Sequence, residues 1–180
     1  MNEVTDERSY LDRAKKIKLL LLDVDGVLTD GKLYFSNSGE ESKAFNILDG
    51  HGLKMLQEYG VQVGIITGRK SELVARRAAD LGIDIVVQGS EDKRMSADAI
   101  RDKLKLNWDQ MAYMGDDYPD LAVMCRCGLA LTVNNAHRAV SARAHWQTKK
   151  NGGEGAVREA CDMILQAQGK YEAALEKYLR

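Results

Sequence analysis

The stretch Leu19–Val27 reads Leu-Leu-Leu-Leu-Asp-Val-Asp-Gly-Val, and it decides the fold class. Four consecutive leucines predict a strand that is buried on both faces, which is typical of a parallel sheet. This strand, expected over Ile17–Asp23, ends in two carboxylates two residues apart, Asp23 and Asp25. Because open α/β sheets bind ligands just beyond the carboxyl ends of their strands, both are candidate site residues. A solvated turn rich in Asp and Gly would show the same pattern, so this window alone is weak.

The same alternation continues along the chain. Short apolar, β-branched runs alternate with segments of helical period, which predicts β-α units and a mainly parallel sheet. Further strands are expected over Val61–Thr67, Ile83–Val87, Met111–Gly115 and Gly128–Thr132, and helices over Gly52–Tyr59, Ser71–Leu81, Lys93–Leu104 and Pro119–Cys127. A chain of 180 residues is the right size for one such domain, expected over residues 1–180.

One segment near the start breaks this rhythm. Leu33–Phe35 and Ser42–Phe45 flank the turn composition Ser36-Asn37-Ser38-Gly39. This arrangement predicts a β-hairpin that projects after the first strand, as a flap over residues 33–46.

A second irregular segment lies near the end, over residues 151–180. Asn151–Gly155 contains three glycines and is expected to be flexible, and an apolar-periodic helix follows from Ala156. The last residues, Lys170–Arg180, predict a polar helix. The glycines either connect the core to these helices or enter a tight space beside a ligand.

The composition excludes several classes of function. The formal net charge is −1, with basic residues spread along the chain, so we expect neither nucleic acid nor an anionic membrane as a partner. The apolar runs are too short to span a bilayer and no signal-peptide pattern is present. The three cysteines, Cys125, Cys127 and Cys161, form no disulfide framework, which favours reduced thiols and a cytoplasmic protein.

Further polar residues follow the other predicted strands. Thr67-Gly68-Arg69 closes the second strand, Asp116, Asp117 and Asp120 follow the fourth, and Lys93 begins the helix after the third. Since parallel strand ends meet at one edge, we expect these groups to share a site. Carboxylates that bind Mg²⁺, together with a lysine that neutralises phosphate charge, suit phosphoryl transfer. Taken alone, Lys93 is better explained as a surface lysine of a helix.

Taken in order, these segments resemble the four motifs of the haloacid dehalogenase superfamily. The matching segments are Asp23-Val24-Asp25-Gly26-Val27, Thr67-Gly68-Arg69, Lys93 and Gly115-Asp116-Asp117-x-x-Asp120. The resemblance implies a Rossmann-like, three-layer α/β/α fold. It also implies a Mg²⁺-dependent phosphatase that forms an aspartyl-phosphate.

The resemblance assigns a role to each motif residue. Asp23 is the nucleophile, and Asp25 is the general acid that later becomes the base for water. Thr67 and Lys93 hold the phosphoryl group. Mg²⁺ binds between Asp23, the backbone carbonyl of Asp25, and Asp116, while Asp117 and Asp120 support the site or face the substrate.

Many members of the superfamily insert a cap domain between these motifs. Here Asp25 to Thr67 has room for the hairpin and one helix, and Thr67 to Lys93 for one helix and one strand. We therefore expect no cap domain, and an open site that another subunit covers.

Within the superfamily the chain resembles the 3-deoxy-D-manno-octulosonate 8-phosphate (Kdo 8-phosphate) phosphatases. The residues that carry this resemblance are Phe45–Gly52, Arg69, Arg77, Val133–Ala136 and Gly152–Glu159. It implies a homotetramer joined through its hairpins, with the glycine-rich tail reaching a neighbouring active site. Besides Asp25 and Lys93, the substrate contacts it implies are Asn46, Asp49, Gly50, Lys54, Gly68, Arg69, Arg77 and Asp117.

Some alternatives stay open. Leu48 stands where that family often carries a basic residue, and Lys54 where arginine is common, which leaves a related nonulosonate 9-phosphate as a second substrate. Arg77 has an alternative as an ion-pair partner of Asp80 on an exposed helix. A phosphotransferase and a non-catalytic subunit are the other functions, and the absence of a cap and the complete motifs disfavour them.

Overall fold

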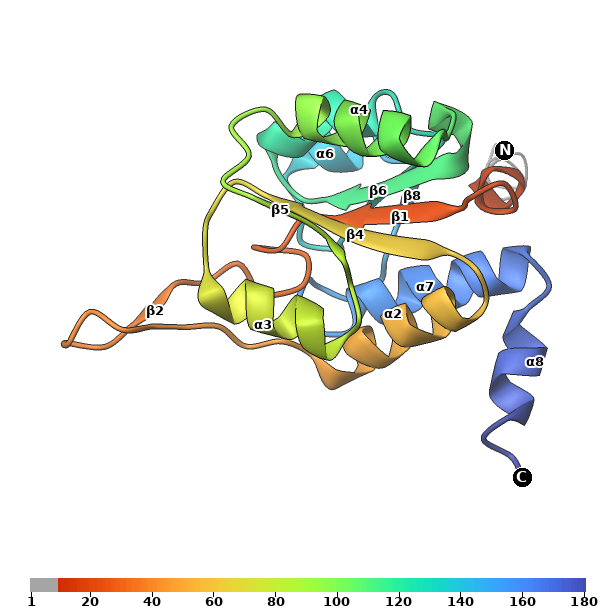
Figure 1. Ribbon diagram of the computed structural model, residues 1–180, viewed down its shortest axis with the longest axis horizontal. Helices are drawn as coiled ribbons and strands as arrows, with labels where there is room; N and C mark the ends of the chain where they lie inside the picture. Colours follow the sequence, from red (N-terminus) through yellow and green to blue (C-terminus); the bar gives the residue numbers. More distant parts are fainter. Residues whose placement is uncertain (1–9) are drawn as a thin grey trace.

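Parallel strands form the central sheet of the computed structural model, which describes residues 10–180 (Figure 1). The strands follow the order β5 (Ile85–Gln88), β4 (Gln62–Thr67), β1 (Leu19–Leu22), β6 (Met111–Gly115), β7 (Leu129–Thr132) and β8 (Trp146–Gln147). Each neighbouring pair is parallel. Leu22 lies opposite both Ile65 and Met114, so β1, β4 and β6 end close to the same level. The first strand is thus central, and polar residues that follow these three strands meet at one edge.

Helices cover both faces of the sheet. One face carries α2 (Ile47–Glu58), α3 (Glu72–Asp80) and α7 (Ala156–Ala167), and the other carries α4 (Lys93–Leu104), α5 (Leu121–Met124) and α6 (Arg138–Ser141). The leucines of β1 alternate between the two cores, with Leu20 and Leu22 on the α2 side and Leu19 and Leu21 on the α4 side. The three-layer, Rossmann-like α/β/α prediction is confirmed.

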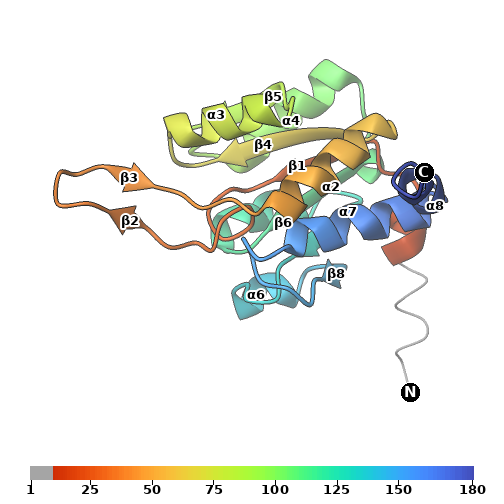
Figure 2. The ribbon, with the colours of Figure 1, turned by 90° about the horizontal axis from the view of Figure 1, so that it is seen from below.

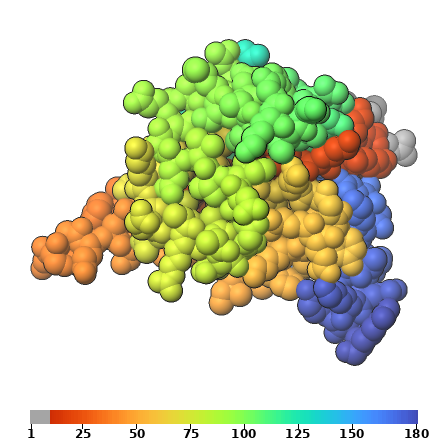
Figure 3. Space-filling model, in the orientation of Figure 1, coloured from red at the N-terminus to blue at the C-terminus, as the bar shows by residue number. Residues whose placement is uncertain are grey.

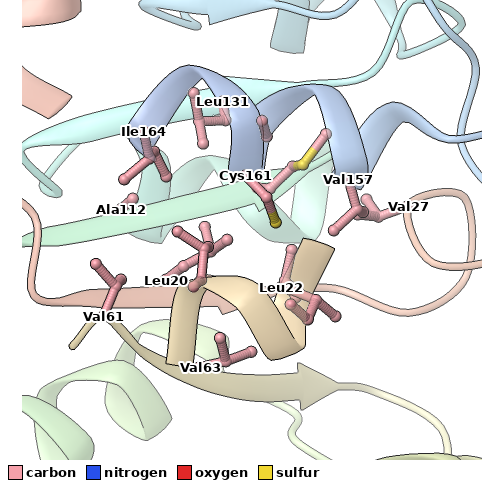
Figure 4. Packing of buried hydrophobic residues seen from close by; sticks show 14 of the residues in the cluster. Leu20, Leu22, Val27, Val61, Val63, Ala112, Leu131, Val157, Cys161 and Ile164 are labelled. Atoms are coloured by element: carbon pink, nitrogen blue, oxygen red, sulfur yellow. The ribbon is translucent and has the colours of Figure 1, made fainter. Parts of the chain in front are cut away.

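The core on the α2 side lies between the sheet and the helices α2 and α7, which pack against each other. Figure 4 shows Val157, Cys161 and Ile164 of α7 facing Leu20 and Leu22 of the sheet, and all five side chains are fully buried. The cysteines of the described chain are unpaired, with Cys127 and Cys161 buried and Cys125 exposed.

Helix α2 begins five residues before the predicted start at Gly52, because Asn46 caps it. The Asn46 side chain accepts the N–H of Leu48 at 2.8 Å. Two glycines in this early part of the helix have close neighbours. A Cβ on Gly50 would lie 2.4 Å from Arg77 Nη2, and one on Gly52 would lie 2.9 Å from Arg158 Cδ.

The predicted hairpin is present and projects from the rest of the molecule (Figures 2 and 3). Its strands β2 (Tyr34–Phe35) and β3 (Glu41–Ser42) pair antiparallel. Between Asp25 and Thr67 the chain forms this hairpin and α2, and between Thr67 and Lys93 it forms α3 and β5. Neither interval holds a cap domain, as predicted.

The glycine-rich segment differs from the prediction, because it is packed and not a flexible tail. A Cβ on Gly152 would lie 1.7 Å from the Gly26 carbonyl oxygen, so a larger residue does not fit. The Gly153 N–H donates to Val27 O at 3.0 Å. Residues 151–155 therefore lie on the loop that follows β1 of the same chain. The reach of the 151–180 segment into a neighbouring subunit concerns an oligomer and stays a prediction.

The remaining elements are short. They are η1 (Trp108–Gln110), η2 (Tyr118–Asp120) and α8 (Tyr171–Glu176), the last being shorter than the predicted Lys170–Arg180. The predicted helix Pro119–Cys127 is divided between η2 and α5. Within residues 10–180, no helix combines the length and apolarity that a membrane crossing requires.

Candidate active site

Four predicted site residues meet at the carboxyl edge of the sheet. Asp23 follows β1, Thr67 is the last residue of β4, Asp116 follows β6, and Lys93 is the first residue of α4. Asp23, Thr67 and Lys93 are buried, with 8%, 2% and 6% of their surfaces exposed. Buried ionisable and hydroxyl groups at a strand edge need partners, and their arrangement defines the site.

Lys93 bridges two buried carboxylates. Its Nζ lies 2.8 Å from Asp23 Oδ1 and 2.8 Å from Asp120 Oδ1. Burial alone would lower the pKa of Lys93, but these two carboxylates raise it above its ordinary value. Lys93 is thus held as a cation beside Asp23, where it can also meet a phosphate. The alternative of a surface lysine does not agree with this burial.

The carboxylates exceed the positive charge available to them. Oxygen atoms of Asp23, Asp116 and Asp120 lie within 4.8 Å of one another. Burial, followed by the charge of Asp120, raises the pKa of Asp23 to about 6. Burial, followed by the charges of Asp23 and Asp120, raises the pKa of Asp116 to about 7. The cluster therefore has a deficit of positive charge.

A divalent cation fits this cluster. Asp116 Oδ1 is buried and has no hydrogen-bond partner, which is costly for a carboxylate oxygen. A hard cation such as Mg²⁺ prefers a few carboxylate oxygens together with waters and phosphate, and this donor set consists of oxygens alone. The residues present match such an ion in charge and in ligand type.

Asp120 supports the cluster and does not complete it. Its Oδ1 accepts from Lys93 Nζ at 2.8 Å and Tyr113 Oη at 2.6 Å, while its Oδ2 accepts the N–H groups of Asp116 and Asp117 at 3.0 and 3.2 Å. Four donors leave this carboxylate little capacity for a metal. Asp23 and Asp116 are the better ligands. The fully buried Tyr113, read as an apolar strand residue, was missed by the sequence analysis.

The loop that carries Asp25 is tied down locally. The Thr29 hydroxyl donates to Val24 O at 3.4 Å and accepts the N–H of Gly31 at 3.2 Å. Gly26 adopts a φ of +94°, and a Cβ there would lie 2.1 Å from Asp116 Oδ2. Glycine is thus required at this position, by its backbone conformation and by the close approach of Asp116.

A lysine that the sequence analysis missed lies beside Asp25. Lys43, just after β3, has a side chain that is only 2% exposed and contacts Asp25 Oδ1. Its Nζ also lies 3.5 Å from Glu41 Oε1, which accepts from Arg69 Nη2 at 2.8 Å. The base of the hairpin is thus joined to Asp25 and Arg69. Charges on a projecting hairpin look solvated in the sequence, so no local signal marked this lysine.

The structure brings three of the predicted substrate residues together. Arg77 Nη2 donates to Asn46 O at 3.2 Å, and its guanidinium lies 5.8 Å from the Phe45 ring centroid. Gly50 leaves the space that Arg77 occupies. Within residues 10–180 no ion pair joins Arg77 to Asp80, so that alternative is not supported.

The structure corrects the prediction for Asp49. Its side chain is 1% exposed, and its Oδ1 accepts the N–H of Arg158 at 2.8 Å, at the start of α7. Burial raises the pKa of Asp49 to about 6, against the effect of N–H groups at this helix end. Asp49 therefore caps α7 from α2 and is closed to a substrate. In the sequence Asp49 lies before the predicted helix start at Gly52, and no local pattern indicates a contact 109 residues away.

Three further predicted substrate residues show no contact that decides their role. Gly68 follows Thr67 directly, Asp117 is exposed and accepts the N–H of Tyr118 at 2.8 Å, and Lys54 is exposed on α2. Their substrate contacts stay predictions.

Comparisons with known proteins agree with this site. Residues 82–160 match the model of the haloacid dehalogenase-like hydrolases. The chain is 46% identical to the 3-deoxy-D-manno-octulosonate 8-phosphate phosphatase KdsC of Yersinia pestis, over 91% of this chain and 88% of that protein.

Solved structures give the same result. A probable YrbI family phosphatase from Pseudomonas syringae superposes with a TM-score of 0.95 at 51% identity, covering 96% of this chain and 98% of that one. The Moraxella catarrhalis Kdo 8-phosphate phosphatase, in complex with magnesium, phosphate and Kdo, gives 0.92 at 40% identity, covering 99% of both chains. The chain therefore belongs to the Kdo 8-phosphate phosphatase family of the haloacid dehalogenase-like hydrolases.

Proposed function

We propose that the protein hydrolyses Kdo 8-phosphate to Kdo and phosphate, with Mg²⁺ as its cofactor and Asp23 as the nucleophile. The observation that carries the proposal is the buried group of Asp23, Lys93 and Asp116, in which one Asp116 oxygen has no partner. Family membership supports the choice of substrate, since the relatives named above carry this activity in their names.

In the first step Asp23 attacks phosphorus. Lys93 lies beside the attacking carboxylate, where it offsets the charge of the phosphoryl group, and Thr67 offers a hydroxyl at the neighbouring strand end. Bound Mg²⁺, held by Asp23 and Asp116, would supply the further positive charge that lets two anions approach. Asp25 donates a proton to the sugar oxygen as the P–O bond breaks.

In the second step water releases the enzyme. Asp25, now ionised, takes a proton from the attacking water, and phosphate leaves Asp23 as its carboxylate returns. One carboxyl group thus serves both half-reactions, and the Asp25 loop holds it next to the nucleophile. Tyr113 and the N–H groups of Asp116 and Asp117 keep Asp120 in place behind Lys93.

We assign sugar-acid recognition to a surface beside the hairpin base, the substrate wall, which is formed by Arg69, Arg77, Asn46 and Gly50. Arg69 and Arg77 approach it from β4 and α3, and each has N–H donors for a carboxylate in addition to the bonds described above. Asn46 and Gly50 shape the same wall.

We further propose a homotetramer in the cytoplasm, with the hairpins at the subunit contacts. Leu33, Tyr34 and Phe35 are 51%, 43% and 62% exposed on the hairpin. Apolar side chains gathered on a projecting element favour an interface. Native mass spectrometry of the wild type and of Phe35→Ser measures the subunit number and its dependence on the hairpin.

Phosphate release from a panel of phosphates, with Mg²⁺ and with chelator, tests the function. The panel contains Kdo 8-phosphate, a nonulosonate 9-phosphate and p-nitrophenyl phosphate. Each is assayed with and without an added alcohol, which would accept a transferred phosphoryl group. The proposal expects Mg²⁺-dependent release that is fastest from Kdo 8-phosphate. Faster release from the 9-phosphate would identify it as the substrate. Transfer to the alcohol would indicate a transferase, and no turnover would indicate a non-catalytic subunit.

Arginine variants test the substrate wall. Arg77→Ala should lower kcat/KM for Kdo 8-phosphate by about one to two decades more than for p-nitrophenyl phosphate, which has no carboxylate to lose. Arg76→Ala, an exposed neighbour on α3, is the matched control. Equal losses on both substrates would assign Arg77 to phosphate binding or to the fold.

A further inference from the structure

Lys43 is an unusual lysine for a hairpin. Its side chain is 2% exposed, whereas Lys32 at the other side of the hairpin is 73% exposed. A lysine ammonium is rarely buried without anionic partners, because the loss of hydration is costly. Lys43 has two such partners, Asp25 and Glu41, and these two carboxylates account for its burial.

Lys43 contacts Asp25, the residue that donates and then accepts a proton in the proposed reaction. Lys43 reaches Asp25 Oδ1, while the Asp25 side chain is 23% exposed at the edge of the site. A carboxylate rotates readily about its last torsion, so an unheld Asp25 would present either oxygen in many directions. A donor fixed on Oδ1 sets the plane of the carboxylate and leaves Oδ2 for proton transfer.

Lys43 is itself held by the hairpin base. Glu41 Oε1 accepts from Arg69 Nη2 at 2.8 Å and lies 3.5 Å from Lys43 Nζ. Charges alternate along the line Asp25, Lys43, Glu41 and Arg69, so each cation lies next to an anion. The hairpin, which projects from the body of the protein between Asp25 and α2 (Figure 2), is thereby joined to the acid–base group.

We propose that Lys43 is a positioning residue that orients Asp25 toward the leaving oxygen, with Glu41 as its anchor. This inference rests on the proposed function. In the step concerned, the Asp23–phosphorus bond forms, the phosphorus–oxygen bond breaks, and the Asp25 proton moves to the departing oxygen. Lys43 is unchanged by the step.

Dependence on the leaving group separates this role from a structural one. A basic leaving group needs a proton as it departs, while p-nitrophenolate departs without one. Phenyl and p-nitrophenyl phosphate both lack a carboxylate, so they differ in leaving-group basicity and not in contacts to the arginines. Lys43→Met should lower kcat/KM, which reports the step that forms the phosphoenzyme, by about tenfold to a hundredfold for phenyl phosphate and by less than about threefold for p-nitrophenyl phosphate.

Matched variants complete the experiment. Lys43→Arg keeps the charge and should restore part of the loss on phenyl phosphate, and Lys32→Met should leave both rates unchanged. Subunit number and thermal midpoint are measured for each variant. If Lys43→Met does not fold, Glu41→Gln carries the test, because it removes the anchor and should produce the same unequal loss.

Equal losses on the two substrates, or no loss on either, would overturn the role of Lys43 while the wild-type phosphatase activity stands. An inactive wild type with every phosphate of the panel would overturn the proposed function, and this inference with it.

Discussion

We expect the affinity of the site for Mg²⁺ to depend on pH, because protons and the ion compete for the same two carboxylates. Asp23 and Asp116 are the proposed ligands, and without a cation their pKa values stand at about 6 and about 7. Mg²⁺ binds the ionised carboxylates, so protons compete with it. Affinity should therefore fall as the pH drops through this range.

The size of the fall follows from the two pKa values. At pH 6, about one-tenth of Asp116 and half of Asp23 are ionised, against nearly all of both at pH 8. The affinity for Mg²⁺ should be roughly twentyfold weaker at pH 6 than at pH 8, equivalent to about 1.8 kcal/mol.

The stability of the fold should depend on pH without the ion and lose that dependence when the ion is bound. In chelator, the raised pKa values mean that the folded state binds protons more tightly than the unfolded state does. Their contribution to stability is present below the unfolded pKa of 3.8 and is lost as the pH rises through about 6 and 7. With saturating Mg²⁺ both carboxylates stay ionised in the folded state, and above about pH 5 they are also ionised in the unfolded state, so these two groups should leave stability nearly constant over that interval.

Calorimetric titration with Mg²⁺ from pH 5.5 to 8.5 measures the affinity, and thermal unfolding in chelator and in Mg²⁺ measures the stability. Asp116→Asn should bind Mg²⁺ weakly and lose part of the pH dependence. Asp84→Asn, an exposed residue before β5, should match the wild type. An affinity that is constant across the range would refute the assignment of these two carboxylates.

Three further substitutions test single contacts. Lys93→Met leaves Asp23 and Asp120 buried without their cation and should lower the free energy of unfolding by about 3–5 kcal/mol in chelator, measured by urea denaturation; unchanged stability would contradict the bridge. Gly26→Ala should cost about 1–3 kcal/mol and also weaken Mg²⁺ binding by displacing Asp116, whereas Gly39→Ala, with a φ of +85° and no atom within 4 Å, should cost stability alone. Asp49→Ala should lose about 1–3 kcal/mol through the uncapped start of α7, while Asp49→Asn keeps an acceptor and should keep the KM for Kdo 8-phosphate. A higher KM in a fully stable Asp49→Asn would return Asp49 to the substrate wall.

The sheet and its edge could be predicted because they depend on local patterns. A run of leucines buried on two faces identifies β1, and polar residues directly after strands identify the edge where Asp23, Thr67 and Asp116 meet. Parallel pairing then fixes their proximity without any knowledge of side-chain contacts. Motif resemblance added the assignment of roles, which spacing alone leaves open.

The parts that could not be predicted depend on contacts between distant segments. Three glycines within 151–155 are compatible with a flexible linker and with tight packing, and only the approach of the Gly26 carbonyl to Gly152 distinguishes the two. The burial of Lys43 and Asp49 likewise depends on Asp25 and on the start of α7, which lie 18 and 109 residues away. Tyr113 lies within a predicted apolar strand, and the sequence pattern gives no sign that its hydroxyl donates to Asp120.

Rapid-quench labelling identifies the residue that receives the phosphoryl group. The protein is mixed with Kdo 8-phosphate carrying a labelled phosphoryl group, in Mg²⁺, and quenched in acid within a single turnover. Borohydride reduction then converts an acyl phosphate to the alcohol, which mass spectrometry locates in the peptide. We expect modification at Asp23, formed and lost at rates consistent with turnover. Turnover of Kdo 8-phosphate with no modification at Asp23, or with modification at another residue, would contradict it.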